Sequence, residues 1–247
     1  MAAGEARLLS IIVPVLNEGL HIEEFLTRLR DCFPTAQLML VDGGSTDDTV
    51  VRALRCGVPV LLGASGRAVQ MNLGAAASRG EWLLFLHADC SPRFSELELR
   101  SLLNDDIRAR DDGWTFFKVR LRGQSRLLGV IAWFMNRRSR LTGVATGDQG
   151  LLLRRTLFEK LEGFAPIPLM EDVELSKRLR RLAAPLDTEL QISASGRRWD
   201  EQGAVRTILR MWGLRLAFWL GVAPQRLWHY YYGRRALAKS RTALAHE

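Results

Sequence analysis

The chain has 247 residues, of which 47% are hydrophobic and 25% charged, as expected for a globular protein with one large core. The net charge is +8, which favours an anionic partner such as nucleic acid, anionic lipid or a phosphorylated substrate. The sequence excludes a spanning helix, because no run reaches about 18 uncharged apolar residues, and its start does not have the pattern of a signal peptide.

The first part of the chain alternates short apolar runs with helical patterns. Continuous β-branched and apolar runs predict four buried strands, at 8–15, 36–44, 58–63 and 81–89. Apolar residues at helical spacing predict helices at 17–33, 45–57, 66–80 and 94–105. We expect Asn17 to cap the first helix, and Ser45 with Asp48 to cap the second. Strands without alternation, separated by helices, predict an α/β fold with a parallel sheet covered on both faces.

The pattern changes after Asp112. It predicts a strand at 114–121, an apolar-then-basic segment at 127–140 and a short strand at 147–155. Two short helices are expected at 157–164 and 171–182. Two more helices are expected at 204–221 and 224–244, with Pro224 in a first turn. We therefore divide the chain into an α/β domain, 1–202, and a helical extension, 203–247, that packs on the domain, a partner or a membrane. Arginine is concentrated beyond Lys118, so the charge belongs to one region.

Polar residues follow the predicted strands where each strand ends. Glu18 follows the first strand, Asp42 ends the second and Asp89 ends the fourth. The carboxyl ends of parallel strands share one edge of the sheet, and ligands bind there. His87 and Asp89 are two residues apart, so on a strand they point to the same side. Together they could bind one divalent cation, although a single aspartate is enough for Mg²⁺ and oxygen ligands suit that ion better.

Each of these motifs also has a purely structural interpretation. Asp42 could belong to a well-formed turn, and Asn17 and Glu18 could cap a helix. Arg67, near a helix N-terminus, could pair with a phosphate or be solvated. Glu171 and Asp172 precede a helix, where they could supply N-terminal charge or a base that accepts a proton from a hydroxyl.

Five segments occur in the order found in family-2 glycosyltransferases of the GT-A fold, which the chain resembles over about residues 8–185. They are "SIIVPVLNE", "VDGGSTDDT", "GRAVQMNLGAAASRGEWLLFLHAD", "GDQGLLLRR" and "MEDVELSKRLRR". "GDQG", "PLMEDVELSKRLRR" and "SGRRW" further resemble the bacterial subfamily associated with arsenosugar biosynthesis and radical-SAM selenodomain proteins. The resemblance implies a three-layer α/β/α fold with a mostly parallel central sheet and a C-terminal helical extension.

The resemblance also implies the reaction: inverting transfer of a sugar from a UDP- or GDP-linked donor to an acceptor hydroxyl, assisted by Mg²⁺ or Mn²⁺. Asp172 matches the general base, and Glu171 would orient it. Asp89 matches the metal-binding aspartate of the DxD motif, while His87 stands where that motif usually has aspartate. The residues implied to contact the donor nucleotide are Pro14, Asn17, Glu18, Asp42, Arg67, Asn72 and His87.

The acceptor or sugar side of the site completes the expected set. Its residues are Asp148, Gln149, Arg197, Arg198 and Trp199. His229 is a further candidate for a metal or phosphate contact, and packing among three tyrosines is the alternative. The acceptor itself is not specified by the sequence.

Two other classes of function fit parts of the sequence less well. A nucleotidyltransferase would be expected to have a glycine-rich phosphate loop near the first strand, and "VPVLNEGL" has none. The charge suggests a nucleic-acid-binding module, but the arginines interleave with apolar residues and no nucleic-acid motif is present, so we expect no such partner.

The Trp-, Tyr- and Arg-rich extension could lie on an anionic membrane and present a lipid-linked acceptor, or it could pack on the domain or form a homodimer. Three cysteines without metal-type spacing indicate a cytoplasmic location, at the inner face of the membrane if the extension binds lipid.

Overall fold

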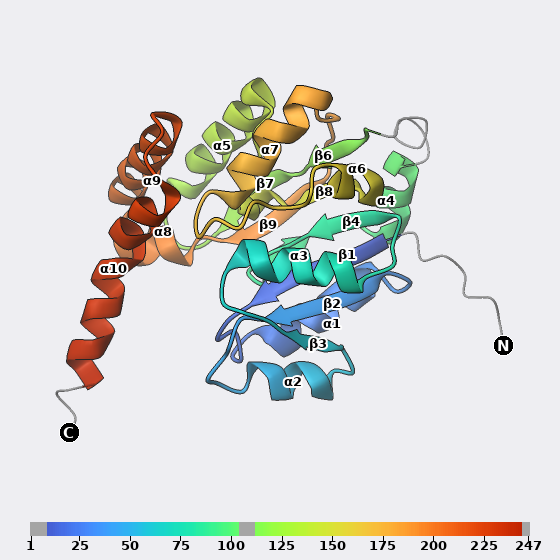
Figure 1. Ribbon diagram of the computed structural model, residues 1–247, viewed down its shortest axis with the longest axis horizontal. Helices are drawn as coiled ribbons and strands as arrows, with labels where there is room; N and C mark the ends of the chain where they lie inside the picture. The colour runs from blue at the N-terminus through green and yellow to red at the C-terminus, as the bar shows by residue number, and fades with distance from the viewer. Residues whose placement is uncertain (1–8, 104–111, 244–247) are drawn as a thin grey trace.

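The computed structural model describes residues 9–103 and 112–243, with side chains described except at Arg198 and 234–243. A six-stranded sheet forms its centre, in the order β3-β2-β1-β4-β8-β6 (Figure 1). Its strands, in chain order, are β1 (Leu9–Val15), β2 (Gln37–Asp42), β3 (Val60–Leu62), β4 (Trp82–Phe85), β6 (Trp114–Phe116) and β8 (Leu151–Arg154). The first four are parallel, and β8 runs antiparallel to β4 and β6.

Helices cover both faces of this sheet. The helices up to the C-terminal group are α1 (Ile22–Cys32), α2 (Thr49–Arg55), α3 (Arg67–Ala77), α4 (Glu96–Leu102), α5 (Leu128–Thr142), α6 (Arg155–Lys160) and α7 (Glu171–Leu182). Successive residues of β1 point to opposite faces: Ile11 and Val13 join the core under α1, and Ile12 joins the core under α3. The predicted α/β fold with a mostly parallel, doubly covered sheet is confirmed.

A second sheet was not predicted. It contains β5 (Cys90–Pro92), β9 (Gln191–Ser195) and β7 (Lys118–Arg122), in that order. The single strand predicted at 114–121 is wrong, because the chain changes sheets at Phe117. The strand predicted through Asp89 also ends early, at Phe85. His87 and Asp89 therefore lie in the turn that carries the chain from β4 into β5.

Both predicted helix caps are wrong. Helix α1 begins at Ile22, and Asn17 lies in the preceding loop with a left-handed backbone (φ 56°), a conformation that asparagine tolerates. Its side-chain oxygen accepts a hydrogen bond from the Thr46 N–H (2.9 Å). Helix α2 begins at Thr49, and the Ser45 hydroxyl donates to Asp42 instead of capping it. The polar residues that look like caps tie two neighbouring loops to each other.

The C-terminal helices stand at one end of the molecule, at the left of Figure 1. They are α8 (Arg197–Gln202), α9 (Ala204–Trp219) and α10 (Pro224–Ala243), the last beginning at Pro224 as predicted. Leu214 of α9 and Leu227 and Tyr231 of α10 form a buried cluster with Met170 and Val173 at the start of α7. Among the described residues, none of the helices is both long and apolar enough to cross a bilayer.

Candidate functional site

The parallel strands open a gap where β1 outlasts β4. Residues up to Val15 of β1 pair with β2, whereas β4 pairs only as far as Ile12. Pro14 lies just beyond Ile12. Because proline has no backbone N–H, no hydrogen-bond donor is left unpaired on the side where β4 has ended. The turn after β4, which carries His87 and Asp89, can therefore diverge from β1.

The loops after β1 and β2 lie at the same carboxyl edge of the sheet. The buried Asp42 carboxylate accepts hydrogen bonds from the N–H groups of Gly44 and Ser45, both at 2.9 Å. These hydrogen bonds hold the loop that follows β2 in place. The pKa of Glu18 is raised, first by burial and then by Asp89, so the two carboxylates lie near one another. Arg197 of α8 partly offsets this repulsion.

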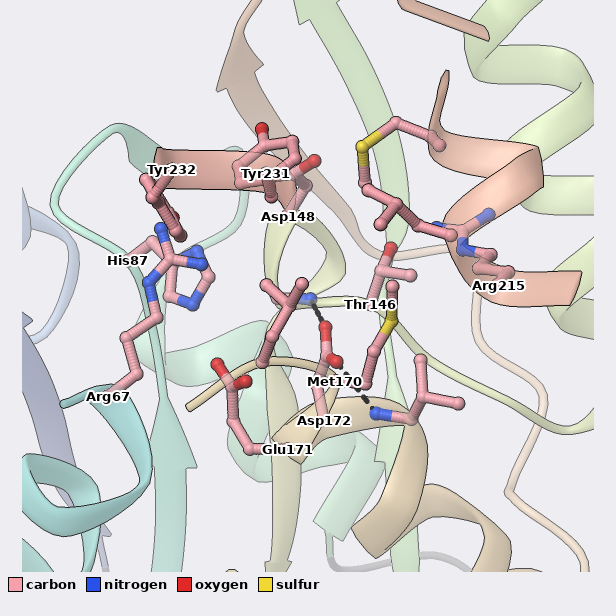
Figure 2. Close-up of a pocket in the computed structure, with 15 residues that line it drawn as sticks. Arg67, His87, Thr146, Asp148, Met170, Glu171, Asp172, Arg215, Tyr231 and Tyr232 are labelled. Atoms are coloured by element: carbon pink, nitrogen blue, oxygen red, sulfur yellow. Dashed lines mark hydrogen bonds between the residues drawn. The ribbon is translucent and has the colours of Figure 1, made fainter. Parts of the chain in front are cut away.

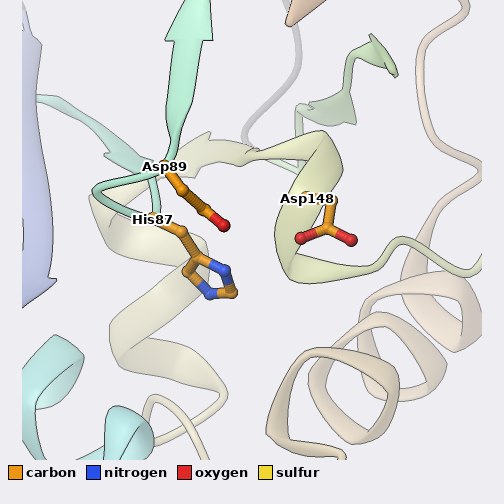
Figure 3. Close-up of side chains that lie close together, drawn as sticks. All are labelled: His87, Asp89 and Asp148. Atoms are coloured by element: carbon orange, nitrogen blue, oxygen red, sulfur yellow. The ribbon is translucent and has the colours of Figure 1, made fainter. Parts of the chain in front are cut away.

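Three potential metal ligands converge on the other side of the gap. One ligand atom from each of His87, Asp89 and Asp148 lies within 4.8 Å of the others, and the three side chains face a common space (Figure 3). Asp148 comes from a short 3-10 helix, η2 (Gly147–Gln149), before β8. A β-carbon on Gly147 would lie 1.9 Å from Cε1 of His87, so only glycine allows this approach. The donor set, two carboxylates and one imidazole, fits a divalent cation.

Gln149 holds the segment that carries Asp148. It is fully buried, and its side-chain oxygen accepts from the Ser139 hydroxyl (2.7 Å) and the Thr146 N–H (3.2 Å). Its amide donates to the Phe117 carbonyl (3.4 Å). Gln149, predicted for the acceptor or sugar side, is thus placed behind the site, where it fixes the loop.

Two adjacent carboxylates at the start of α7 face this segment (Figure 2). The Asp172 carboxylate accepts hydrogen bonds from the N–H groups of Gly147 (2.6 Å) and Val173 (2.7 Å). Glu171 is only 4% exposed, and burial together with Asp172 raises its pKa to about 7, against the opposing effect of Arg67. With a pKa of about 7, Glu171 is partly protonated near neutral pH.

A cavity of about 70 Å³ lies between these carboxylates and the C-terminal helices. Arg67, at the start of α3, keeps part of its surface exposed while its guanidinium reaches into the cavity (Figure 2). Burial opposes its charge, but Tyr232, Glu171 and Asp148 outweigh that effect and raise its pKa. Arg67 is thus a fixed cation beside Glu171.

Helices α9 and α10 supply part of the cavity wall, which the sequence did not predict. Their contributions are Met211, Leu214, Arg215, Tyr231 and Tyr232. Burial lowers the pKa of Arg215 despite the attraction of Asp172 and Asp148, and its Nε has no hydrogen-bond partner among the described residues. The signal that could have revealed it is an arginine inside the apolar run "GLRLAFW".

A second cavity, of about 130 Å³, adjoins the first at Asp148. It is lined by Asp89 and Asp148 together with Arg197 and Trp199 of α8. These two residues of the predicted acceptor or sugar side are thus brought to the metal ligands. The side chain of Arg198 lies outside the described residues.

Asn72 and His229, both predicted for the site, lie apart from the group formed by the potential metal ligands and the two carboxylates. Asn72 donates to the Phe164 carbonyl (2.8 Å) and accepts from its N–H (2.9 Å), which ties α3 to the loop after α6. The ring of His229 packs against Trp228, with centroids 5.2 Å apart, and does not belong to the group formed by His87, Asp89 and Asp148. Their predicted ligand contacts stay predictions.

Residues 10–104 match the model of glycosyl transferase family 2. Glucosyl-3-phosphoglycerate synthase of Mycobacterium tuberculosis is 32% identical over an alignment of 102 residues, which covers 36% of this chain and 31% of the relative. The chain therefore matches about a third of the length of this curated relative. The resemblance to family 2 is confirmed for this segment, and the narrower subfamily stays a prediction.

Solved glycosyltransferase structures share the fold. The mannosyltransferase PcManGT from Pyrobaculum calidifontis, in complex with GDP-Man and Mn²⁺, has a TM-score of 0.53 at 20% identity, covering 74% of this chain and 56% of that one. S. aureus TarS 1-349 in complex with UDP has a TM-score of 0.54 at 18% identity, with 76% and 60% covered. Glucosyl-3-phosphoglycerate synthase from M. tuberculosis, with phosphoglyceric acid, has 0.53 at 23% identity, with 83% and 78% covered. These similarities show the GT-A fold.

Proposed function

We propose that this protein is an inverting glycosyltransferase that moves a sugar from a nucleoside-diphosphate sugar to an acceptor hydroxyl. The observation that carries the proposal is the convergence of His87, Asp89 and Asp148 with Glu171 and Asp172 at the carboxyl edge of the sheet. A group of metal ligands next to a pair of acids suits a reaction that needs a bound diphosphate and a base. The match of residues 10–104 to glycosyl transferase family 2 supports the same reaction.

The donor is proposed to be a UDP- or GDP-linked sugar. Its nucleotide would lie at the carboxyl edge of the sheet, by the loops after β1 and β2, where Asn17, Glu18 and Asp42 are placed. Support comes from proteins of the same fold that carry UDP or GDP-Man. Arg67 is positioned as a permanent cation toward the diphosphate, for which its fork of N–H donors is suited.

Asp172 is proposed to accept the proton of the attacking hydroxyl. The Gly147 and Val173 N–H groups donate to its carboxylate and hold it in one orientation. Glu171, whose pKa is about 7, is partly protonated near neutral pH, and its protonated form can donate a hydrogen bond within the site. A single base and a single displacement invert the anomeric carbon.

A divalent cation, Mg²⁺ or Mn²⁺, is the implied cofactor. Asp89 and Asp148 would hold it through carboxylate oxygens, with His87 as a nitrogen donor, and this set fits such an ion. When bound, the cation neutralises the diphosphate charge and stabilises the leaving group. Cys90, next in the chain to Asp89, is fully buried and its pKa is raised by burial, so its thiol stays protonated.

The proposal is tested with a panel of UDP- and GDP-sugars, each assayed with Mg²⁺ and Mn²⁺ for thermal stabilisation and for release of nucleoside diphosphate. At least one donor should stabilise the protein in a metal-dependent manner. Asp172→Asn should keep that stabilisation and lose turnover, whereas Asp89→Asn should weaken the metal-dependent binding by at least about tenfold.

Asp187→Asn is the matched control, because it removes an exposed carboxylate paired with Arg140, away from the cavity linings. It should behave as the parent chain. Stabilisation by no nucleotide sugar, or equal loss of binding in all three variants, would contradict the proposed function.

A further inference from the structure

We propose that α5 and α9 form a docking face for an anionic lipid bilayer. We call it the aromatic face, and it contains the exposed apolar residues of these helices and their adjoining turns: Leu127, Val130, Trp133, Phe134, Leu141, Val205, Leu209, Trp212, Leu216, Trp219 and Leu220. Every exposed Trp, Phe or Tyr side chain among the described residues lies on α5, α9 or α10. Exposed apolar side chains gathered on neighbouring helices point to an interaction site.

Helix α9 presents a regular stripe to solvent. Val205, Leu209, Trp212, Leu216 and Trp219 follow one another at alternating steps of four and three residues, which places them on one side of the helix. Trp212 is 62% exposed and Trp219 is 72% exposed. The stripe is about 20 Å long at the rise of an α-helix. The described part of the chain leaves this side of α9 uncovered.

Helix α5 lies near α9 and carries exposed aromatic side chains of its own. Trp133 is 56% exposed and Phe134 is 54% exposed, and their rings contact each other at 4.9 Å. The two helices are neighbours, because Arg215 of α9 lies close enough to lower the pKa of Arg138 on α5, after the larger effect of burial. Figure 1 shows both helices at the same end of the molecule.

The charge of these helices identifies the partner. Residues 113–147, which include α5, contain seven basic residues and no acidic ones; residues 202–246, which include α9 and α10, contain eight and none. Aromatic and aliphatic side chains together with arginines are the composition of helices that lie in the interface of an anionic bilayer. A second copy of this chain fits less well, because a two-fold interface would place two arginine-rich helix pairs against each other.

The docking face and the reaction site share α9. Its outward side carries the aromatic stripe, while Met211, Leu214 and Arg215 line the cavity next to Asp172. Membrane binding would therefore hold the cavity beside the lipid surface. The inference itself does not depend on the proposed reaction.

Vesicle flotation of the full chain tests the proposal. Binding should be strong to vesicles of phosphatidylcholine with about a third phosphatidylglycerol, at least about tenfold weaker to phosphatidylcholine alone, and reduced by raising the salt from about 0.1 to about 0.5 M. The W212S/W219S variant should lose at least about tenfold in binding to the acidic vesicles. The R137Q/R206Q variant should lose about fivefold for each charge removed.

The matched control is L62S/L97S, which removes two similarly exposed apolar side chains from β3 and α4. It should bind vesicles as the parent chain does, and all variants should keep the parent's melting temperature. Equal binding to both vesicle types, or no binding, overturns the proposal. So does a dimer in solution that W212S/W219S dissociates, since the face would then belong to a second copy.

Discussion

Replacing Glu171 with Gln should stabilise the protein in a pH-dependent manner. The Glu171 carboxyl is 4% exposed, and its pKa rises from 4.5 to about 7 through burial and the neighbouring Asp172. Between these two pH values the folded state binds more protons than the unfolded state, so stability falls as the pH rises. At about 1.4 kcal/mol for each pH unit, the ionised, buried Glu171 costs the folded protein about 3 kcal/mol above pH 7.

Urea unfolding of both proteins at about pH 4.5 and about pH 8 measures this cost. The advantage of Glu171→Gln should be larger at the higher pH by about 3 kcal/mol. Comparing the two pH values removes any constant effect of the amide. An unchanged difference between the proteins would show that Glu171 titrates normally and would refute the argument from burial. Glu189→Gln, on an exposed carboxylate whose pKa Lys118 lowers, should show no such gain on raising the pH.

Three glycine and glutamine substitutions test how the site is held. Gly147→Ala puts a methyl group within 1.9 Å of His87 and should weaken metal-dependent nucleotide binding, measured by calorimetry, at least about tenfold. The control is Gly129→Ala, whose added β-carbon would meet no atom within 4 Å and should leave that binding unchanged. Gln149→Leu leaves buried partners unsatisfied and should cost about 2 to 4 kcal/mol by urea unfolding; a cost below about 1 kcal/mol would count against its loop-holding role. Gly74→Leu forces α3 away from Ile12, which a β-carbon would approach to 2.5 Å, and should lower the unfolding free energy by about 1 to 3 kcal/mol; unchanged stability would refute that close packing.

The central sheet was predictable because strands such as β1, β2 and β4 are buried on both faces. Runs such as "SIIVPV" carry no alternation, and the helices between them have clear apolar periodicity. The second sheet was not predictable in the same way. Its strand β5 has three residues, and β7 continues directly from β6 with only Phe117 between them. A change of sheet inside one apolar run leaves no local signal.

The candidate site residues next to the ends of strands and helices could be identified from the sequence. Those brought together only by the folding of distant segments were harder to predict. Asp89 and Asp172 were identified from their positions next to a strand and a helix. Asp148 was assigned to the acceptor or sugar side, yet it lies with His87 and Asp89, because a glycine lets two distant loops touch. The arginine inside an apolar run is a local signal for Arg215, but no local pattern indicates that Tyr232 of the last helix lines the same cavity.

The central claim is that the carboxyl edge of the sheet binds a nucleoside diphosphate together with a divalent cation held by Asp89 and Asp148. Calorimetric titration of UDP and GDP, each with and without Mn²⁺, tests it most directly. In the parent chain Mn²⁺ should raise the affinity for at least one of the two by about tenfold or more, and Asp89→Asn should abolish most of that gain. Absence of binding to both nucleotides, or equal affinity with and without Mn²⁺, would contradict the claim.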